Sequence, residues 1–160
     1  MRIGIVVTAR PGVEDLAVRA EALGFSSFWV YDTPMVNGDP FTSLGLCAKA
    51  TSRIKLGIGV TSPALRSPPA AAAAVSSLNA LAPGRVICGI GTGNTAIDAM
   101  NASAYSEGER TRTIKFLRVG PYVNTDDPVE FVVAASGLEA AAIAGPSRRR
   151  GHAAGTSMAR

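Results

Sequence analysis

Short apolar runs alternate with longer helical segments through the first part of the chain. Four runs are rich in β-branched and aromatic residues, and they predict strands at residues 2–7, 27–31, 54–60 and 86–90. The segments between them have apolar side chains at helical spacing or a high helix propensity, and they predict helices at residues 14–23, 40–50 and 68–81. Strand and helix alternate strictly, which is the order of a parallel α/β fold.

The segment Ile54–Asn94 contains the clearest unit of this pattern. Its first strand leads to a helix that begins at Pro68 and Pro69, where the missing N–H group of proline is not needed. Pro83 and Gly84 end that helix, and a second strand follows at once. Two short strands joined by such a helix form a βαβ unit, so the two strands are expected to pair in parallel.

Both strands of this unit end in glycine. Gly57 and Gly59 lie late in the first strand, and Gly89, Gly91 and Gly93 close the second. Such glycines either permit tight turns and close packing or let a ligand approach the backbone. Because ligands of open α/β sheets and of α/β barrels bind at the carboxyl ends of the strands, this clustering favours a ligand site.

The regular alternation stops after the second glycine-rich strand end. A fifth strand is predicted at residues 130–135, together with a short extra strand at 114–117 and the start of a helix at 138–144. Residues 146–160 have no apolar period and predict a disordered basic tail. The expected organisation is one folded domain at residues 1–145 followed by that tail.

Charge and composition narrow the classes of function. The 160-residue chain is 47% hydrophobic, enough for one sizeable core. Lys and Arg number 16 against 12 Asp and Glu, but the excess is accounted for by Arg148, Arg149, Arg150 and Arg160, and no acidic residue follows Glu139. A nucleic-acid binder carries its basic residues on a folded face, so nucleic acid is not an expected partner.

Residue types that carry chemistry are sparse. Cys47 and Cys88 have neither metal-binding spacing nor a CxxC motif, and the single histidine, His152, lies in the predicted tail. The sequence has no Ser/His/Asp set and no metal-binding cluster, so any chemistry is expected to come from a bound cofactor. No apolar run is long enough to cross a membrane and the N-terminus lacks a signal-peptide layout, so a cytoplasmic location is expected.

Four separated blocks of the sequence resemble the luciferase-like flavin and deazaflavin oxidoreductases. They are AEALGFSSFWVYD, DPF, TSRIKLGIGVTSPALRSPPA and LAPGRVICGIGTGN. The similarity is greatest to the branch typified by methylenetetrahydromethanopterin reductase, and it covers residues 1–94, with a weaker match at 111–145. It implies an oxidoreductase or monooxygenase that uses FMN or coenzyme F420, for hydride transfer or oxygen activation on a small organic substrate.

The same resemblance implies a (β/α)8 barrel that binds its cofactor at the carboxyl ends of the strands. A complete barrel needs ~250 residues, so the expected fold is a partial (β/α)8 TIM barrel of about four to five βα units with parallel strands. Strand faces and edges would then be exposed. A homo-oligomer or a partner chain that covers them is therefore expected.

The resemblance also places the cofactor site residue by residue. Asp32 matches an acidic residue beside the cofactor at the end of the second strand, and Thr33 stands where F420 users often have histidine. The Gly59–Val60 peptide matches a non-proline cis peptide that forms a bulge behind the flavin ring, with Thr61 just beyond it. The loop after the fourth strand wraps the cofactor in the family. The implied cofactor-binding residues are Asp32, Gly59, Val60, Thr61, Gly91, Gly93 and Asn94, with no catalytic residue and no metal assigned.

Several of these residues have simpler interpretations. Asp32 is also typical of a turn at a strand end, and Arg66 is either solvated or contacts a cofactor phosphate. Trp29, in mid-strand, is expected in the core. Asn94 stands where some relatives carry a catalytic glutamate, so the sugar-phosphate chemistry of that branch is not implied.

Two alternative functions remain open at this point. The first is a truncated, catalytically inactive fragment or a partner-dependent subunit of such an enzyme. The second is a Rossmann-like nucleotide-binding module, suggested by the stretch GIGTGNTA. That fingerprint also expects an acidic residue at a strand end ~20 residues further on, and the sequence has none there.

Overall fold

The computed structural model describes residues 2–34, 36–91, 124 and 126–134 of the chain. Its elements follow the predicted ones to within two residues at each end. They are β1 (Gly4–Val7), α1 (Val13–Ala22), β2 (Ser27–Val30), α2 (Pro40–Ala50), β3 (Lys55–Thr61), α3 (Pro68–Leu81), β4 (Val86–Ile90) and β5 (Glu130–Val133). The predicted strand at 114–117, the helix start at 138–144 and the tail at 146–160 lie outside the described residues.

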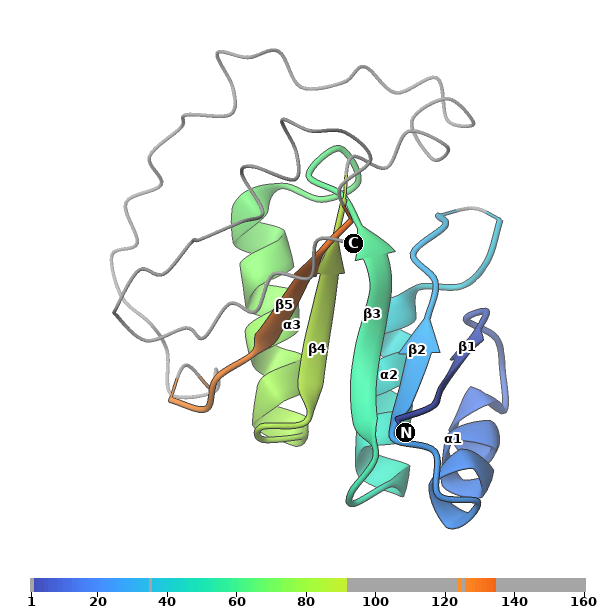
Figure 1. Cartoon of the computed structure of the whole chain (residues 1–160). Coiled ribbons are helices and arrows are strands. Elements are labelled where there is room, and N and C mark those ends of the chain that lie inside the picture. The colour runs from blue at the N-terminus through green and yellow to red at the C-terminus, as the bar shows by residue number, and fades with distance from the viewer. Residues whose placement is uncertain (1, 35, 92–123, 125, 135–160) are drawn as a thin grey trace.

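The strands form one parallel sheet in the order β1-β2-β3-β4-β5 (Figure 1). Each strand therefore pairs with the next strand along the chain, as the short βαβ links predict. The expected parallel pairing of β3 and β4 is confirmed. The fifth strand is also confirmed, beside β4.

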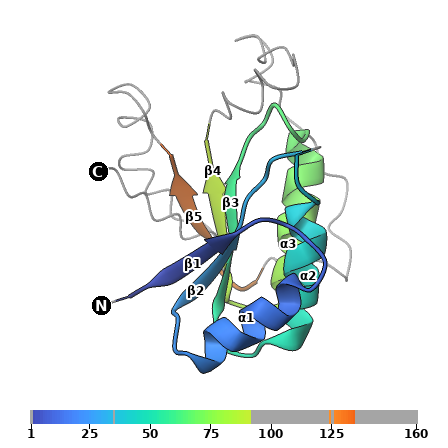
Figure 2. The ribbon, with the colours of Figure 1, turned by 90° about the vertical axis from the view of Figure 1, so that its right-hand side faces the viewer.

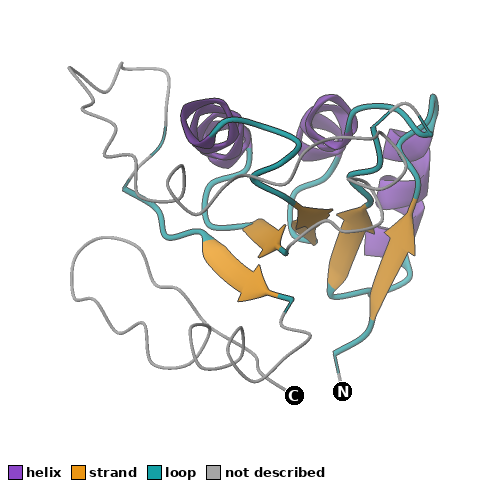
Figure 3. Ribbon diagram, turned by 90° about the horizontal axis from the view of Figure 1, so that it is seen from above, coloured by secondary structure: helices purple, strands orange, loops and turns teal. Residues whose placement is uncertain are grey.

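All three described helices cover the same face of the sheet (Figures 2 and 3). A Rossmann-like module winds its helices over both faces of the sheet. Helices on one face and strands in sequential order are instead the arrangement of consecutive βα units of a barrel. The expected partial (β/α)8 barrel is thus the observed fold, and the opposite face of the sheet, called the open face below, has no described helix on it.

The hydrophobic core lies between the sheet and this helical layer. Alternate side chains of β2 and β3 point into it, and Phe28, Val30, Leu56 and Ile58 are fully buried there. Trp29, which the sequence placed in the core, is only half-buried. By strand alternation its side chain lies on the open face instead, because its neighbours Phe28 and Val30 occupy the helix-covered face.

Local sequence signals explain where the helices begin and end. The side chain of Asp39 accepts a hydrogen bond from the Thr42 N–H group at 2.8 Å and caps α2, with Pro40 as its first residue. Pro68 opens α3 in the same way. Gly24 follows α1 with a φ of 81°, a left-handed conformation that favours glycine at a helix end.

Two charged side chains fasten the loops at the amino-terminal edge of the sheet. The carboxylate of Glu21 accepts hydrogen bonds from the backbone N–H groups of Arg53 and Ile54, both at 2.7 Å, and also from Ser52. The guanidinium of Arg85 donates to the carbonyl oxygens of Ala48, Thr51 and Ile54. These contacts stabilise the edge opposite the predicted site.

Candidate functional site at the carboxyl ends of the strands

The structure places five of the seven predicted cofactor-binding residues at one edge of the sheet. These are Asp32 after β2, Gly59, Val60 and Thr61 in β3, and Gly91 after β4. Val60 and Gly91 are neighbours, because a Cβ added at Gly91 would lie 2.6 Å from Cγ1 of Val60. Gly93 and Asn94 lie outside the described residues, and their assignment stays a prediction.

Asp32 is the most unusual side chain at this edge. It is 5% exposed, and neither carboxylate oxygen has a hydrogen-bond partner within the described part of the chain. Burial, together with the nearby Asp32 charge, raises the pKa of the Cys88 thiol to about 12, so the carboxylate lies close to β4. A buried polar group without partners is costly, and such groups in native proteins call for an explanation such as a bound ligand.

Thr61, the last residue of β3, repeats this feature on the neighbouring strand. Its residue is 5% exposed, and its Oγ1 atom is buried with no hydrogen-bond partner among the described residues. A hydroxyl can both donate and accept a hydrogen bond, whereas an ionised carboxylate only accepts. Asp32 and Thr61 therefore offer a polar ligand an acceptor and a donor at adjacent strand ends.

The end of β3 contains a β-bulge. Ile58 pairs with Cys88 and Thr61 pairs with Ile90, so three steps along β3 oppose two along β4. The predicted bulge is present, but the predicted cis peptide at Gly59–Val60 is wrong, since every described peptide bond is trans. The bulge itself accommodates the extra residue of β3.

The glycines on the open face have packing reasons of their own. A Cβ at Gly57 would lie 2.2 Å from the Trp29 ring. At Gly59 a Cβ would meet the Val30 carbonyl oxygen at 2.8 Å, and at Gly89 it would meet the Ile58 carbonyl oxygen at 2.8 Å. Close packing therefore explains these glycines, as the simpler interpretation expected. Of the latter two, Gly59 is partly exposed, whereas Gly89 is buried.

Arg66 already has partners within the protein. Its guanidinium forms an ion pair with the Asp39 carboxylate and lies 4.6 Å from the centre of the Phe41 ring. Burial raises the pKa of Asp39, but the Thr42 N–H group and the Arg66 charge outweigh it, so the pKa lies below its ordinary value. The structure thus gives Arg66 a role in joining α2 to the loop before α3.

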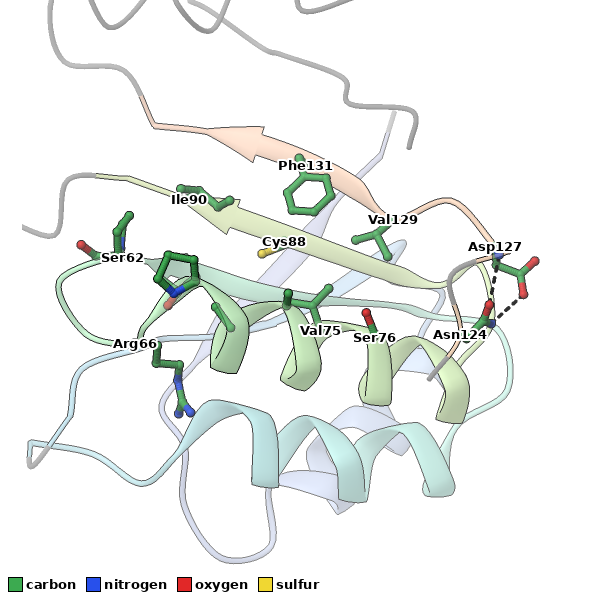
Figure 4. Close-up of a pocket in the computed structure, with 15 residues that line it drawn as sticks. Ser62, Arg66, Val75, Ser76, Cys88, Ile90, Asn124, Asp127, Val129 and Phe131 are labelled. Atoms are coloured by element: carbon green, nitrogen blue, oxygen red, sulfur yellow. Dashed lines mark hydrogen bonds between the residues drawn. The ribbon is translucent and has the colours of Figure 1, made fainter. Parts of the chain in front are cut away.

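A cavity of about 390 Å³ lies between α3 and strands β4 and β5, and sequence reasoning missed it (Figure 4). Val75, Ile90, Val129 and Phe131 contribute to its largely apolar wall, and Thr61 borders it at the carboxyl edge. It could not be found from sequence because it depends on β5 packing beside β4, a pairing between segments far apart in the chain.

Comparison with known proteins supports the fold and the family. Residues 8–131 match the family model of luciferase-like monooxygenases. The 5,10-methylenetetrahydromethanopterin reductase of Methanolobus tindarius is 41% identical over 85 residues, which cover 52% of this chain and 26% of the relative.

Two solved structures share the fold. One is the coenzyme F420-dependent tetrahydromethanopterin reductase of Methanopyrus kandleri, with a TM-score of 0.69 and 24% identity over 90% of this chain and 53% of that chain. The other is the oxygenating constituent of 3,6-diketocamphane monooxygenase from Pseudomonas putida in complex with FMN, with a TM-score of 0.53 and 16% identity over 88% of this chain and 59% of that chain.

In each case the chain spans only part of the protein it matches. The family match nevertheless runs from the residue after β1 into β5 and includes α1, α2, α3 and strands β2, β3 and β4. The chain therefore belongs to the luciferase-like monooxygenase family.

Proposed function

We propose that the carboxyl edge of β2, β3 and β4 binds the ring of FMN or coenzyme F420. The buried Asp32 carboxylate, whose two oxygens have no hydrogen-bond partner among the described residues, is the observation that carries this proposal. The rings of both cofactors have N–H groups that can donate to such an acceptor. One structural neighbour named for coenzyme F420 and another in complex with FMN support the choice of cofactor.

The activity proposed for the protein is that of an oxidoreductase, in which the cofactor carries the hydride or activates oxygen for a small organic substrate. Asp32 orients the polar edge of the ring, and the Thr61 hydroxyl supplies a second hydrogen bond. The partly exposed backbone at Gly59 lets a planar ring approach the strand end closely. Gly93 and Asn94 complete the site in this proposal. The proposed location of the protein is the cytoplasm.

Thr33 follows Asp32, at the position where F420 users often have histidine. Threonine does not titrate near neutral pH, so this position does not provide a general acid as histidine does. The proposal consequently assigns cofactor binding to the described residues and assigns no catalytic acid or base.

A partner-dependent subunit, or an inactive fragment, is the second candidate. Ile3, Val6 and Val60 are 52%, 49% and 44% exposed, which leaves large apolar side chains uncovered on and beside β1 and β3. A complete barrel buries the equivalent faces. In this alternative, another chain covers the open face, and cofactor binding requires that chain.

Titration of the purified protein with FMN and with F420, followed by absorbance, tests the proposal. We expect saturable binding of one cofactor and about a tenfold weaker affinity for Asp32→Asn, because a charge-assisted hydrogen bond is lost. Asp15→Asn, at an exposed residue of the first turn of α1, is the matched control and should bind like the wild type.

Two results would contradict this proposal. If the wild type binds neither cofactor, the inactive or partner-dependent alternative is favoured. If Asp32→Asn is folded by circular dichroism and binds as tightly as the wild type, the site has been assigned to the wrong residues.

A further inference from the structure

The apolar wall of the cavity beside α3, β4 and β5 is only partly covered. Ile90, Val129 and Phe131 line this cavity, and all three side chains remain partly exposed although they pack against the core. Protein interiors contain few voids larger than a water molecule, whereas this cavity measures about 390 Å³. Exposed apolar walls around a hollow of this size are typical of a surface that another segment or molecule covers.

The handedness of the β4–β5 connection directs it over this cavity. The two strands are adjacent and parallel, so the chain leaves β4 at the carboxyl edge of the sheet and enters β5 at the amino-terminal edge. Connections between parallel strands of one sheet are right-handed in about 98% of cases. The three earlier connections, through α1, α2 and α3, all lie on one face (Figures 2 and 3). A connection of the same hand therefore runs over that face, beyond α3, where the cavity lies.

The described end of this connection is attached to α3. The backbone N–H group of Asn124 donates to the Ser76 carbonyl oxygen, and its side-chain amide donates to the Asn79 carbonyl oxygen, both at 3.3 Å. The fully buried side chain of Asn79 in turn donates to the Asp127 carbonyl oxygen at 2.9 Å. Ser76, Asn124 and Asp127 also line the cavity (Figure 4). The chain thus approaches β5 from the helix-covered face, along the cavity itself.

Residues 92–123, which lie outside the described residues, make up the rest of this connection. Their large apolar side chains fall into two groups along the sequence. The first group consists of Ile97, Met100 and Tyr105, and the second of Ile114, Phe116, Leu117, Val119, Tyr122 and Val123. The second group is the denser one and comes just before Asn124, so it is the group that a cavity bordered by Asn124 brings within reach.

Charge complementarity also favours the second group. Arg112, Lys115 and Arg118 are interleaved with its apolar residues. At the end of the cavity where the chain enters β5, the described charged residues are Asp126, which is exposed, and Asp127, which lines the cavity. Basic side chains around an apolar stretch match a cavity with an apolar wall and an acidic end.

We propose that the side chains of residues 114–119 pack in this cavity and complete the core on the helix-covered face beside β5. In this arrangement Ile114, Phe116 and Leu117 replace water on the apolar walls formed by Val129 and Phe131, which the hydrophobic effect favours. The surface beside β5 is then filled by the chain's own β4–β5 connection. This packing requires no bound cofactor, so it stands or falls apart from the proposed function.

The two free cysteines allow a direct measurement of this packing. Cys88 lines the cavity and is 2% exposed, whereas Cys47 is fully buried on α2, away from the cavity lining. Reaction of the folded protein with iodoacetamide, followed by peptide mass spectrometry, gives a separate rate for each thiol. A variant that opens only the cavity raises the rate of Cys88 alone, and one that unfolds the whole domain raises both rates.

Phe116→Ala tests the proposed occupant of the cavity. We expect it to raise the reaction rate of Cys88 about tenfold, because removing a large core side chain favours local opening, and to leave the rate of Cys47 unchanged. Tyr105→Ala, in the first apolar group of the same connection, is the matched control. It should react like the wild type at both thiols.

Other results would overturn the proposal. Equal rates at Cys88 in the wild type and in a folded Phe116→Ala variant would mean that residues 114–119 do not fill the cavity. Acceleration by Tyr105→Ala instead would identify the first group as the occupant. A wild-type rate at Cys88 that falls with rising protein concentration would show that a second copy of the chain covers the cavity. If Phe116→Ala raises both rates, Leu117→Ala decides by the same criterion.

Discussion

At the scale of single residues, Glu21 links the ionisation of one carboxylate to the stability of the fold. Partial burial raises the pKa of Glu21, but the backbone N–H donors of Ile54, Arg53 and Ser52 outweigh it and lower the pKa to about 2. In the unfolded chain the ordinary value is 4.5. The stabilisation is therefore complete above about pH 4.5 and is lost as the pH falls toward 2.

Replacement of Glu21 should reveal this pH dependence. We expect Glu21→Gln to lower the free energy of unfolding at pH 7 by about 1–2 kcal/mol, a value reduced by the solvent near the carboxylate. The difference from the wild type should shrink by more than half at pH 3, where the wild-type carboxylate has lost most of its advantage. Urea unfolding at both pH values measures it, and an equal difference at the two would contradict the assignment.

Residue identity alone could not separate the roles of the glycines. Gly84 has a φ of 68° in a turn, whereas Gly57 makes room for an indole and Gly59 for a neighbouring strand. The sequence correctly predicted that glycines cluster at the strand ends. The structural roles of Gly57 and Gly59, however, depend on contacts between strands. Asp32 was found from its place in a family motif, while its burial and its missing partners emerged only in three dimensions.

At the scale of elements, the start of α2 is joined to the loop before α3. Asp39 caps α2 through the Thr42 N–H group and also binds the Arg66 guanidinium, which stacks on Phe41. The cap is a local signal, because Asp39 directly precedes Pro40 at the start of the predicted helix. The ion pair links residues 27 positions apart, and no local pattern could indicate it.

Two substitutions of Asp39 should separate the cap from the ion pair. Asp39→Ala removes both and should lower the free energy of unfolding by about 1–2 kcal/mol. Asp39→Asn keeps a capping oxygen and loses only the charge, so a loss of about 0.5 kcal/mol or less is expected, and it should diminish in high salt. Equal losses for the two variants would mean that the cap contributes nothing measurable.

For the strands as well, features that depend on neighbouring residues in the sequence could be predicted, whereas a feature that depends on distant residues could not. Periodicity located β1 to β4, and short links made their order predictable. The position of β5 was predicted along the chain, but the cavity that it forms with α3 was not, because it arises from side chains of Val75 and Phe131 that are far apart in sequence. Among the residues that the structure describes, no helix is long and apolar enough to cross a membrane.

At the scale of the whole molecule, the loop contacts of Glu21 and Arg85 and the candidate site occupy opposite edges of the sheet. Glu21 and Arg85 fasten the loops at the amino-terminal edge. Asp32, Thr61 and Gly91 lie at the carboxyl edge. Barrels of this architecture generally separate stability from function in this way, since the loops that carry function follow the carboxyl ends of the strands.

This separation predicts that the two edges contribute independently to stability. A cofactor that binds only the folded state adds about 2.7 kcal/mol to the free energy of unfolding at a free concentration one hundred times its Kd. Glu21→Gln should lower the stability of the free protein yet show the same increment, to within about 0.5 kcal/mol, because it is distant from the site. Asp32→Asn, at the same cofactor concentration, should show a clearly smaller increment.

Urea unfolding with and without FMN or F420, at one fixed concentration for all variants, measures these increments. A full increment in Glu21→Gln and a reduced one in Asp32→Asn would locate binding at the carboxyl edge alone. A Glu21→Gln variant that unfolds cooperatively but gains no stability from the cofactor would show that the two edges are coupled through the sheet. Cofactor binding would then depend on the loops at both edges, and the site could not be described by its carboxyl-edge residues alone.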